Sequence, residues 1–84
     1  MDIVFKEKPV AMLLVLLHSK KVLYASSLSK QVNYTYSHSV KVLSTMEKEG
    51  LIFFEKHGRM KVIELTPKGK RVAEEIEKIK RITE

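Results

Sequence analysis

Three boundary signals between residues 35 and 67 divide this stretch into a helix, a hairpin and a second helix. Thr35 is a suitable N-cap for a helix that stops at Gly50, because glycine readily takes the left-handed backbone that follows a helix C-terminus. Thr66 followed by Pro67 supplies a cap and then proline in the first helical turn, which predicts a last helix to about Ile82. Only two short strands and a turn fit between these helices.

The stretch between the two predicted helices has the composition of a β-hairpin. Residues 51–56 and 61–66 are β-prone, and residues 57–60, with Gly58 among them, separate the two. Four basic side chains surround the turn: Lys56, His57, Arg59 and Lys61. A hairpin tip is often charged simply because it is exposed, but cations there can also hold phosphates or enter a narrow minor groove. We expect the tip to contact nucleic acid.

The N-terminal end predicts one largely buried helix. Pro9 suits a first helical turn, and apolar residues then cover nearly the whole circumference of a helix that ends near His18, so several neighbours must cover it. Residues 1–8 alternate loosely around Ile3 and Phe5 and predict at most a short extension or strand.

A short strand and a second helix are predicted next. Residues 22–24 can form an edge strand, and Ser26 can cap a helix that continues to Val32. Asn33 and Tyr34 then form a tight turn, because asparagine tolerates a left-handed backbone. Two helices joined by such a turn are a helix-turn-helix, whose second helix enters the DNA major groove when its outer face is polar and basic.

The predicted elements follow one another as helix, short strand, helix, helix, hairpin and helix, without a linker or repeat. A chain of 84 residues has room for one modest core, so a single α+β domain over residues 1–84 is expected.

The formal net charge is +6 and the sequence pI is about 9.7. Residues 20–61 hold eight basic and three acidic residues, a net of +5. Such concentration favours a polyanionic partner over a merely solvated surface.

The helix predicted over residues 35–49 separates into two faces. At about 100° per residue, one arc is apolar and is predicted to face the core: Tyr36, Ser39, Val40, Leu43 and Met46. Every residue on the opposite side can form hydrogen bonds, and the predicted DNA contacts there, with the capping threonine, are Tyr34, Thr35, Ser37, His38, Lys41, Thr45 and Lys48. Val42 at the margin suits packing better than contact with a thymine methyl group. No acidic residue occurs between Glu7 and Glu47, where a carboxylate would repel phosphate.

Three segments carry a family resemblance. The runs "SLSKQV", "VKVLSTMEKEGLI" and "GRMKVIELTPKG", within residues 27–69, resemble the winged-helix regulators of the MarR-like and related archaeal and bacterial families. The resemblance implies a winged helix-turn-helix, with residues 35–49 as the recognition helix, the hairpin as the wing, and a last helix that often serves dimerisation. Full-length MarR-like proteins are much longer and place further helices around a ligand cleft, so no effector site is assigned.

The last helix carries an apolar seam. Its members recur at alternating spacings of four and three residues, with one more beside them, and form the predicted dimer interface: Val72, Ile76, Ile79, Thr83 and Ile82. The seam can instead pack on Leu13, Leu14 and Leu17 of the first helix within one chain. Because so short a chain has little core to cover both helices, we expect residues 67–84, with part of the first helix, to form a two-fold homodimer.

Other classes of function receive less support. There is no cysteine, and the three histidines stand 20 and 19 residues apart, without the close pairing of a metal site, so no enzyme activity, metal or cofactor is expected. The apolar run of residues 10–17 is too short to cross a bilayer, and a cytoplasmic location without a membrane partner is expected.

The predicted function is sequence-specific binding of double-stranded DNA as a transcriptional regulator. A protein-interaction or RNA-binding module is the alternative, and Tyr34 and Tyr36 leave single-strand stacking open.

Overall fold

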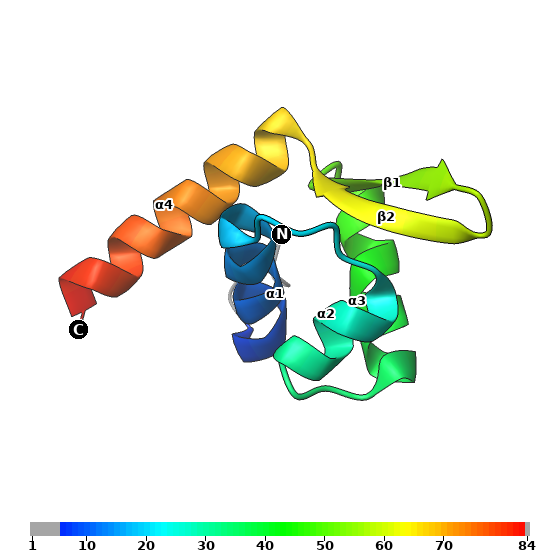
Figure 1. Ribbon diagram of the computed structural model, residues 1–84. Helices are drawn as coiled ribbons and strands as arrows, with labels where there is room; N and C mark the ends of the chain where they lie inside the picture. The colour runs from blue at the N-terminus through cyan, green and yellow to red at the C-terminus, as the bar shows by residue number, and fades with distance from the viewer. Residues whose placement is uncertain (1–5, 84) are drawn as a thin grey trace.

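The computed structural model describes residues 6–83, so the extension or strand predicted around Ile3 and Phe5 lies outside the described residues. The elements follow in the order α1 (Glu7–His18), α2 (Ala25–Gln31), α3 (Tyr36–Lys48), β1 (Ile52–His57), β2 (Met60–Leu65) and α4 (Pro67–Thr83). The hairpin and the end of α4 leave the three-helix core in opposite directions (Figure 1), and the molecule measures 41 × 26 × 24 Å. This is the predicted winged helix-turn-helix architecture.

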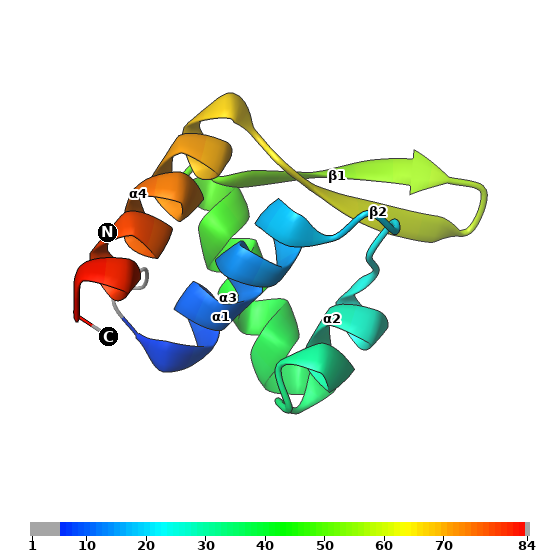
Figure 2. The ribbon, with the colours of Figure 1, turned by 60° about the vertical axis from the view of Figure 1, so that its left-hand side comes forward.

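The core lies where α1, α2 and α3 meet the base of the hairpin (Figure 2). Its fully buried side chains come from each of these elements and include Met12, Leu13, Leu28, Leu43, Met46 and Ile52. The predicted need to cover α1 on several sides is confirmed, because α2, β2 and α4 all pack against it. No helix in the part of the chain described here is both long and apolar enough to cross a membrane.

Two predicted boundaries in the N-terminal half are wrong. The strand predicted over residues 22–24 is reduced to one bridge, in which the Ile63 N–H donates to the Leu23 carbonyl at 2.8 Å. The second helix begins at Ala25, so Ser26 is not its cap. Tyr24 occupies the cap position, and the Ser27 hydroxyl accepts from the Tyr24 N–H and donates to the Tyr24 carbonyl. Ser27, in the first turn of the helix, therefore accepts the hydrogen bond from the backbone N–H of the cap residue Tyr24.

The boundaries of α3 are confirmed. Asn33 has φ 56° in the turn before it, the left-handed conformation that asparagine tolerates. The Thr35 hydroxyl accepts from the His38 N–H at 3.2 Å and caps the helix. After Lys48, Gly50 has φ 76° and ends the helix as predicted.

The wing is a two-stranded antiparallel hairpin. His57 pairs with Met60, so these two residues belong to the strands and only Gly58 and Arg59 form the turn, with Gly58 at φ 62°. The register pairs Phe54 with Ile63 and Lys56 with Lys61. Residues directly opposite each other share one face, as do residues two apart along a strand.

The start of α4 is joined to the end of α3. The Thr66 hydroxyl accepts from the Gly69 N–H at 2.9 Å, which confirms the predicted cap, and donates to the Gly50 carbonyl at 2.5 Å. The Thr66 N–H also donates to the Leu51 carbonyl at 3.0 Å. Gly69 is buried against that carbonyl. The "LTPKG" segment thus locks α4 onto the chain between α3 and the wing.

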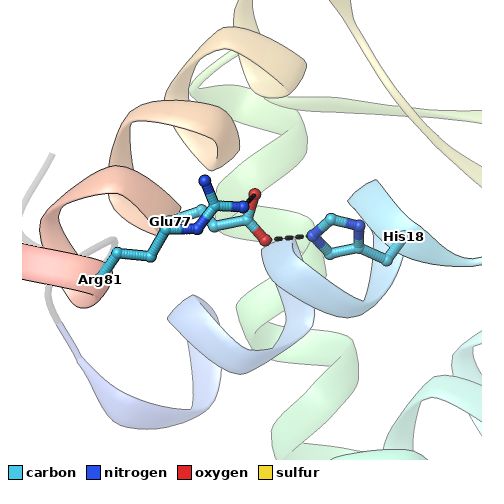
Figure 3. A network of polar contacts seen from close by, with 3 residues as sticks. All are labelled: His18, Glu77 and Arg81. Carbon is cyan, nitrogen blue, oxygen red and sulfur yellow. Dashed lines mark hydrogen bonds and ion pairs between the residues drawn. The ribbon is translucent and has the colours of Figure 1, made fainter. Parts of the chain in front are cut away.

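Further along, α4 is held to α1 by a polar contact (Figure 3). His18 Nε2 contacts a carboxylate oxygen of Glu77, whose other oxygen accepts from Arg81 at 3.3 Å. His18 is the last residue of α1. The contact links the middle of α4 to the end of α1 at the surface of the molecule.

Candidate nucleic-acid interface

A polar row runs along the outermost face of α3. Ser37, Lys41, Ser44 and Lys48 recur at spacings of four and three residues, and all four side chains are exposed. Ser44 was absent from the predicted contacts, although the same spacing could have identified it. Because the row lies opposite Leu43 and Met46, which are buried, it is the face that α3 offers to a partner.

His38 is held at the N-terminus of α3 by its neighbours. The Thr35 hydroxyl, which accepts the backbone N–H of His38, also lies 2.7 Å from His38 Nδ1. This contact through Nδ1 orients the imidazole. Thr35 therefore serves both the helix cap and the position of His38.

Tyr34 is positioned differently from the other predicted contacts. Its side chain is half-buried against the core, and its ring stacks on His38 with centroids 5.2 Å apart. On α1, Lys8 donates to the Val32 carbonyl at 2.7 Å and lies 5.9 Å from the centre of the Tyr34 ring. The Tyr34 ring thus packs against the His38 imidazole. Lys8 bonds to the turn between α2 and α3 through the Val32 carbonyl.

The predicted apolar arc of α3 is partly wrong. Ser39, Leu43 and Met46 are buried as expected, but Tyr36 is 60% exposed and Val40 is 41% exposed. The two exposed residues, Tyr36 and Val40, face the wing and are not covered by core side chains. Val42 is half-buried against the core, so the packing role predicted for it is confirmed. On the other flank, the exposed Thr45 donates its hydroxyl proton to the Lys41 carbonyl at 3.1 Å.

A groove of about 710 Å³ lies between α3, the start of α2 and the wing. On the α3 side, Tyr36, Val40 and Ser44 line it. On the wing side, the register puts Lys56 and Lys61 on the same strand face as Phe54, and both line the groove together with Arg59. Lys61 Nζ lies 6.0 Å from the centre of the Phe54 ring. Three of the four predicted wing contacts therefore border one space with α3.

His57, the fourth predicted wing contact, belongs to an acidic cluster. Its Nε2 lies 3.5 Å from a Glu55 carboxylate oxygen, on the strand face opposite to Lys56. A hydrogen bond from Glu64 lowers the pKa of Glu55 below its ordinary 4.5, and His57 lowers it further. The same bond raises the pKa of Glu64. The wing is thus basic toward α3 and acidic on its other face.

The residues of the predicted α4 seam have two environments. Val72 and Ile76 are half-buried against the core of the same chain, which is the alternative considered for the seam. Ile79 and Ile82 are 56% and 83% exposed, and Thr83 is exposed with its hydroxyl bonded to its own helix. Within residues 6–83, no three histidine, aspartate or glutamate side chains are grouped so that they could hold a metal ion.

Comparison with known proteins supports this reading of the fold. The crystal structure of AF1382 from Archaeoglobus fulgidus is similar with 28% identity and a TM-score of 0.89, over 99% of this chain and 94% of that one. The MepR–DNA complex of Staphylococcus aureus matches with 21% identity and a TM-score of 0.83, over 98% of this chain and 69% of that one. A mutant of ZitR from Lactococcus lactis in its apo form matches with 19% identity and a TM-score of 0.81, over 90% and 58%. The last two show the fold alone.

No curated protein sequence matches the chain. A second structure of MepR, described as a transcription regulator of a multidrug efflux pump, is matched over 56% of its length, so this chain spans little more than half of that regulator. A model of the family described as winged helix-turn-helix matches residues 10–84, nearly the whole chain. The observed helices, wing and match agree, and the chain belongs to the winged helix-turn-helix family.

Proposed function

We propose that this chain binds double-stranded DNA sequence-specifically as a transcriptional regulator. Helix α3 enters the major groove, and the wing residues 56–61 lie on the adjacent backbone or minor groove. The main observation behind this proposal is that Lys56 and Lys61 of the wing border the same groove as α3. The acidic pair of the wing, Glu55 and Glu64, lies on the opposite strand face. A polyanion is therefore attracted to the face of the wing that borders α3.

The chemistry of α3 supports direct reading of bases. Ser37 and Lys41 lie in its exposed row, and His38 is held beside them, so donors and acceptors face outward near the helix N-terminus. MepR, whose structure with DNA shares this fold, shows that the architecture is compatible with a duplex. We infer that the protein acts by binding rather than by catalysis, and that it works in the cytoplasm.

The test is selection of bound duplexes from a random pool at a stated salt concentration, followed by affinity measurements on the selected site. Replacing Lys41 with Ala should weaken specific binding by roughly 1–3 kcal/mol. Lys70→Ala is the matched control, because it removes the same charge from an exposed position on α4. A pool that yields no consensus contradicts the proposal, as does equal weakening by the two variants.

The alternative partners predict different outcomes. An RNA-binding protein would prefer RNA over the selected duplex, and a protein-interaction module would show only weak, sequence-independent DNA binding. A protein-interaction module does not explain why Ser44 of the polar row and three wing cations, Lys56, Arg59 and Lys61, border one groove.

We also propose a two-fold homodimer through the end of α4. Ile79 and Ile82 are exposed on the part of α4 that extends beyond the core (Figure 1), where a second copy could cover them together with part of α1. A dimer would set two α3 helices about one helical turn apart on a roughly palindromic site. Ile79→Glu should shift the protein toward monomer in analytical ultracentrifugation, whereas Val22→Glu, at an exposed valine outside α4, should not. A parent protein that is monomeric at tens of micromolar and on DNA refutes the dimer.

A further inference from the structure

Apolar side chains are concentrated in the groove between α3 and the wing. Seven large apolar residues are exposed within the described part of the chain, and three of them, Tyr36, Val40 and Met60, line this one groove. Tyr36 and Val40 lie one turn apart on α3, with Val40 directly beside the polar row at Ser37, Lys41 and Ser44 and Tyr36 next to Val40 on the wing side. The apolar strip is therefore part of the face that α3 offers to DNA.

The charges around this strip identify its occupant. Lys56, Arg59 and Lys61 border the groove on the wing side, and Lys41 is exposed beside Val40 on α3. Glu47, in the last turn of α3, is the one acidic residue among the described residues that line it. A polyanion fits this frame, and the occupant must also present an apolar group. On the major-groove edge of a duplex, that group is the C5-methyl of thymine.

We propose that Val40 and Tyr36 are specificity-determining residues that contact thymine methyl groups. Val40 makes the closer contact because its short side chain lies next to the polar row, and the Tyr36 ring covers the neighbouring position on the wing side. The inference rests on the proposed function, since it assumes a duplex against α3. It places base discrimination on apolar contacts of the Val40 side chain and the Tyr36 ring, in addition to the polar contacts of Ser37 and Lys41.

The experiment isolates the methyl group itself. In the selected duplex, each thymine is replaced in turn by deoxyuridine, which removes only the C5-methyl and keeps base pairing. At one or more thymines, the parent protein should lose about fourfold in affinity, the effect of exposing one methyl-sized group. Val40→Ala should bind the thymine duplex more weakly and show little or no further loss with uracil at that position.

Two control variants distinguish contact from stability. Val22→Ala makes the same substitution at another exposed valine and should keep the full preference for thymine. Tyr36→Phe should keep it too, because the ring face and not the hydroxyl makes the contact. Far-ultraviolet circular dichroism and thermal unfolding verify that each variant folds.

Each outcome decides between the proposals. If no duplex is bound specifically, the proposed function and this inference both fail. If a duplex is bound specifically but every thymine tolerates uracil, or the site lacks thymine under α3, the inference alone is overturned. Full thymine preference in Val40→Ala also overturns it for Val40 and leaves the regulator function standing.

Discussion

Replacing Gly69 with Ala should destabilise the protein, although alanine favours helices. An ideal Cβ at this position would lie 1.8 Å from the Leu51 carbonyl oxygen, 2.7 Å from its carbon and 3.1 Å from the Leu51 Cα. These are backbone atoms, so no side-chain rotation can relieve the overlap. The first turns of α4 and the chain after α3 must separate instead.

The separation is large enough to break specific bonds. Restoring a distance of 3.0 Å requires a shift of about 1.2 Å from the 1.8 Å contact. The Thr66 N–H bond to Leu51 and the Thr66 hydroxyl bond to Gly50 span the same junction. Overpacking costs about 1–3 kcal/mol and each lost hydrogen bond about 1 kcal/mol, against a gain of about 1 kcal/mol from helix propensity. With both bonds lost, the expected net loss is about 2–4 kcal/mol.

Urea and thermal unfolding of matched samples measure this loss. For a domain of this size, the midpoint of thermal unfolding should fall by roughly 10–30 °C. Lys70→Ala, one residue further along the same helix, is exposed and should change stability by about 0.5 kcal/mol or less. A Gly69→Ala protein as stable as the parent, or more stable by the propensity gain, refutes the close approach of α4 to Leu51.

Three further outcomes are expected. His38→Ala should weaken specific DNA binding by roughly 1–3 kcal/mol while the unfolding free energy changes little, and equal binding by parent and variant would remove His38 from the contact surface. Arg59→Ala should lower affinity for many sequences alike and reduce the slope of log affinity against log salt by about one if it contacts phosphate, and an unchanged slope would contradict that contact. In the folded protein the pKa of Glu64 is raised and that of Glu55 is lowered, so Glu64 should take up a proton before Glu55 as the pH falls. Protonation of Glu64 should therefore increase the stability of the fold, whereas protonation of Glu55 should decrease it. Carboxyl-carbon NMR titration checks this, with the Glu55 pKa rising toward its ordinary value in Glu64→Ala; an unchanged Glu55 titration would refute the shared hydrogen bond.

Local chemistry was sufficient to predict most element boundaries. Thr35, Gly50 and Thr66 each act within one turn of the backbone, so their neighbours in sequence determine what they do. The predicted start of α2 is wrong because Ser26 and Ser27 both follow Tyr24 closely, and the sequence alone does not select Ser27 as the residue that bonds back to Tyr24. The strand predicted over residues 22–24 is wrong because only Leu23 pairs with β2, and the chain enters α2 at Ala25.

The candidate site was predicted less completely than the fold. Helical periodicity identifies a buried arc by its average hydropathy, but the neighbours of α3 cover only the part around Ser39, Leu43 and Met46. Tyr36 and Val40 lie beyond those neighbours, and no property of the isolated helix reveals this. The two charge faces of the wing were equally hidden, since they depend on the strand register. The contact residues and the dimer interface stay predictions.

The register of the wing places two like charges against each other. Lys56 and Lys61 are directly opposite across the hairpin, and such a pair weakens the ladder that carries it. Added salt screens this repulsion, so salt should stabilise the hairpin of the free protein. The same salt weakens the complex with DNA. Part of the salt dependence of binding then originates inside the protein. A phosphate between the two ammonium groups would remove the repulsion, and backbone amides near the tip should exchange with solvent more slowly on DNA than in the free protein.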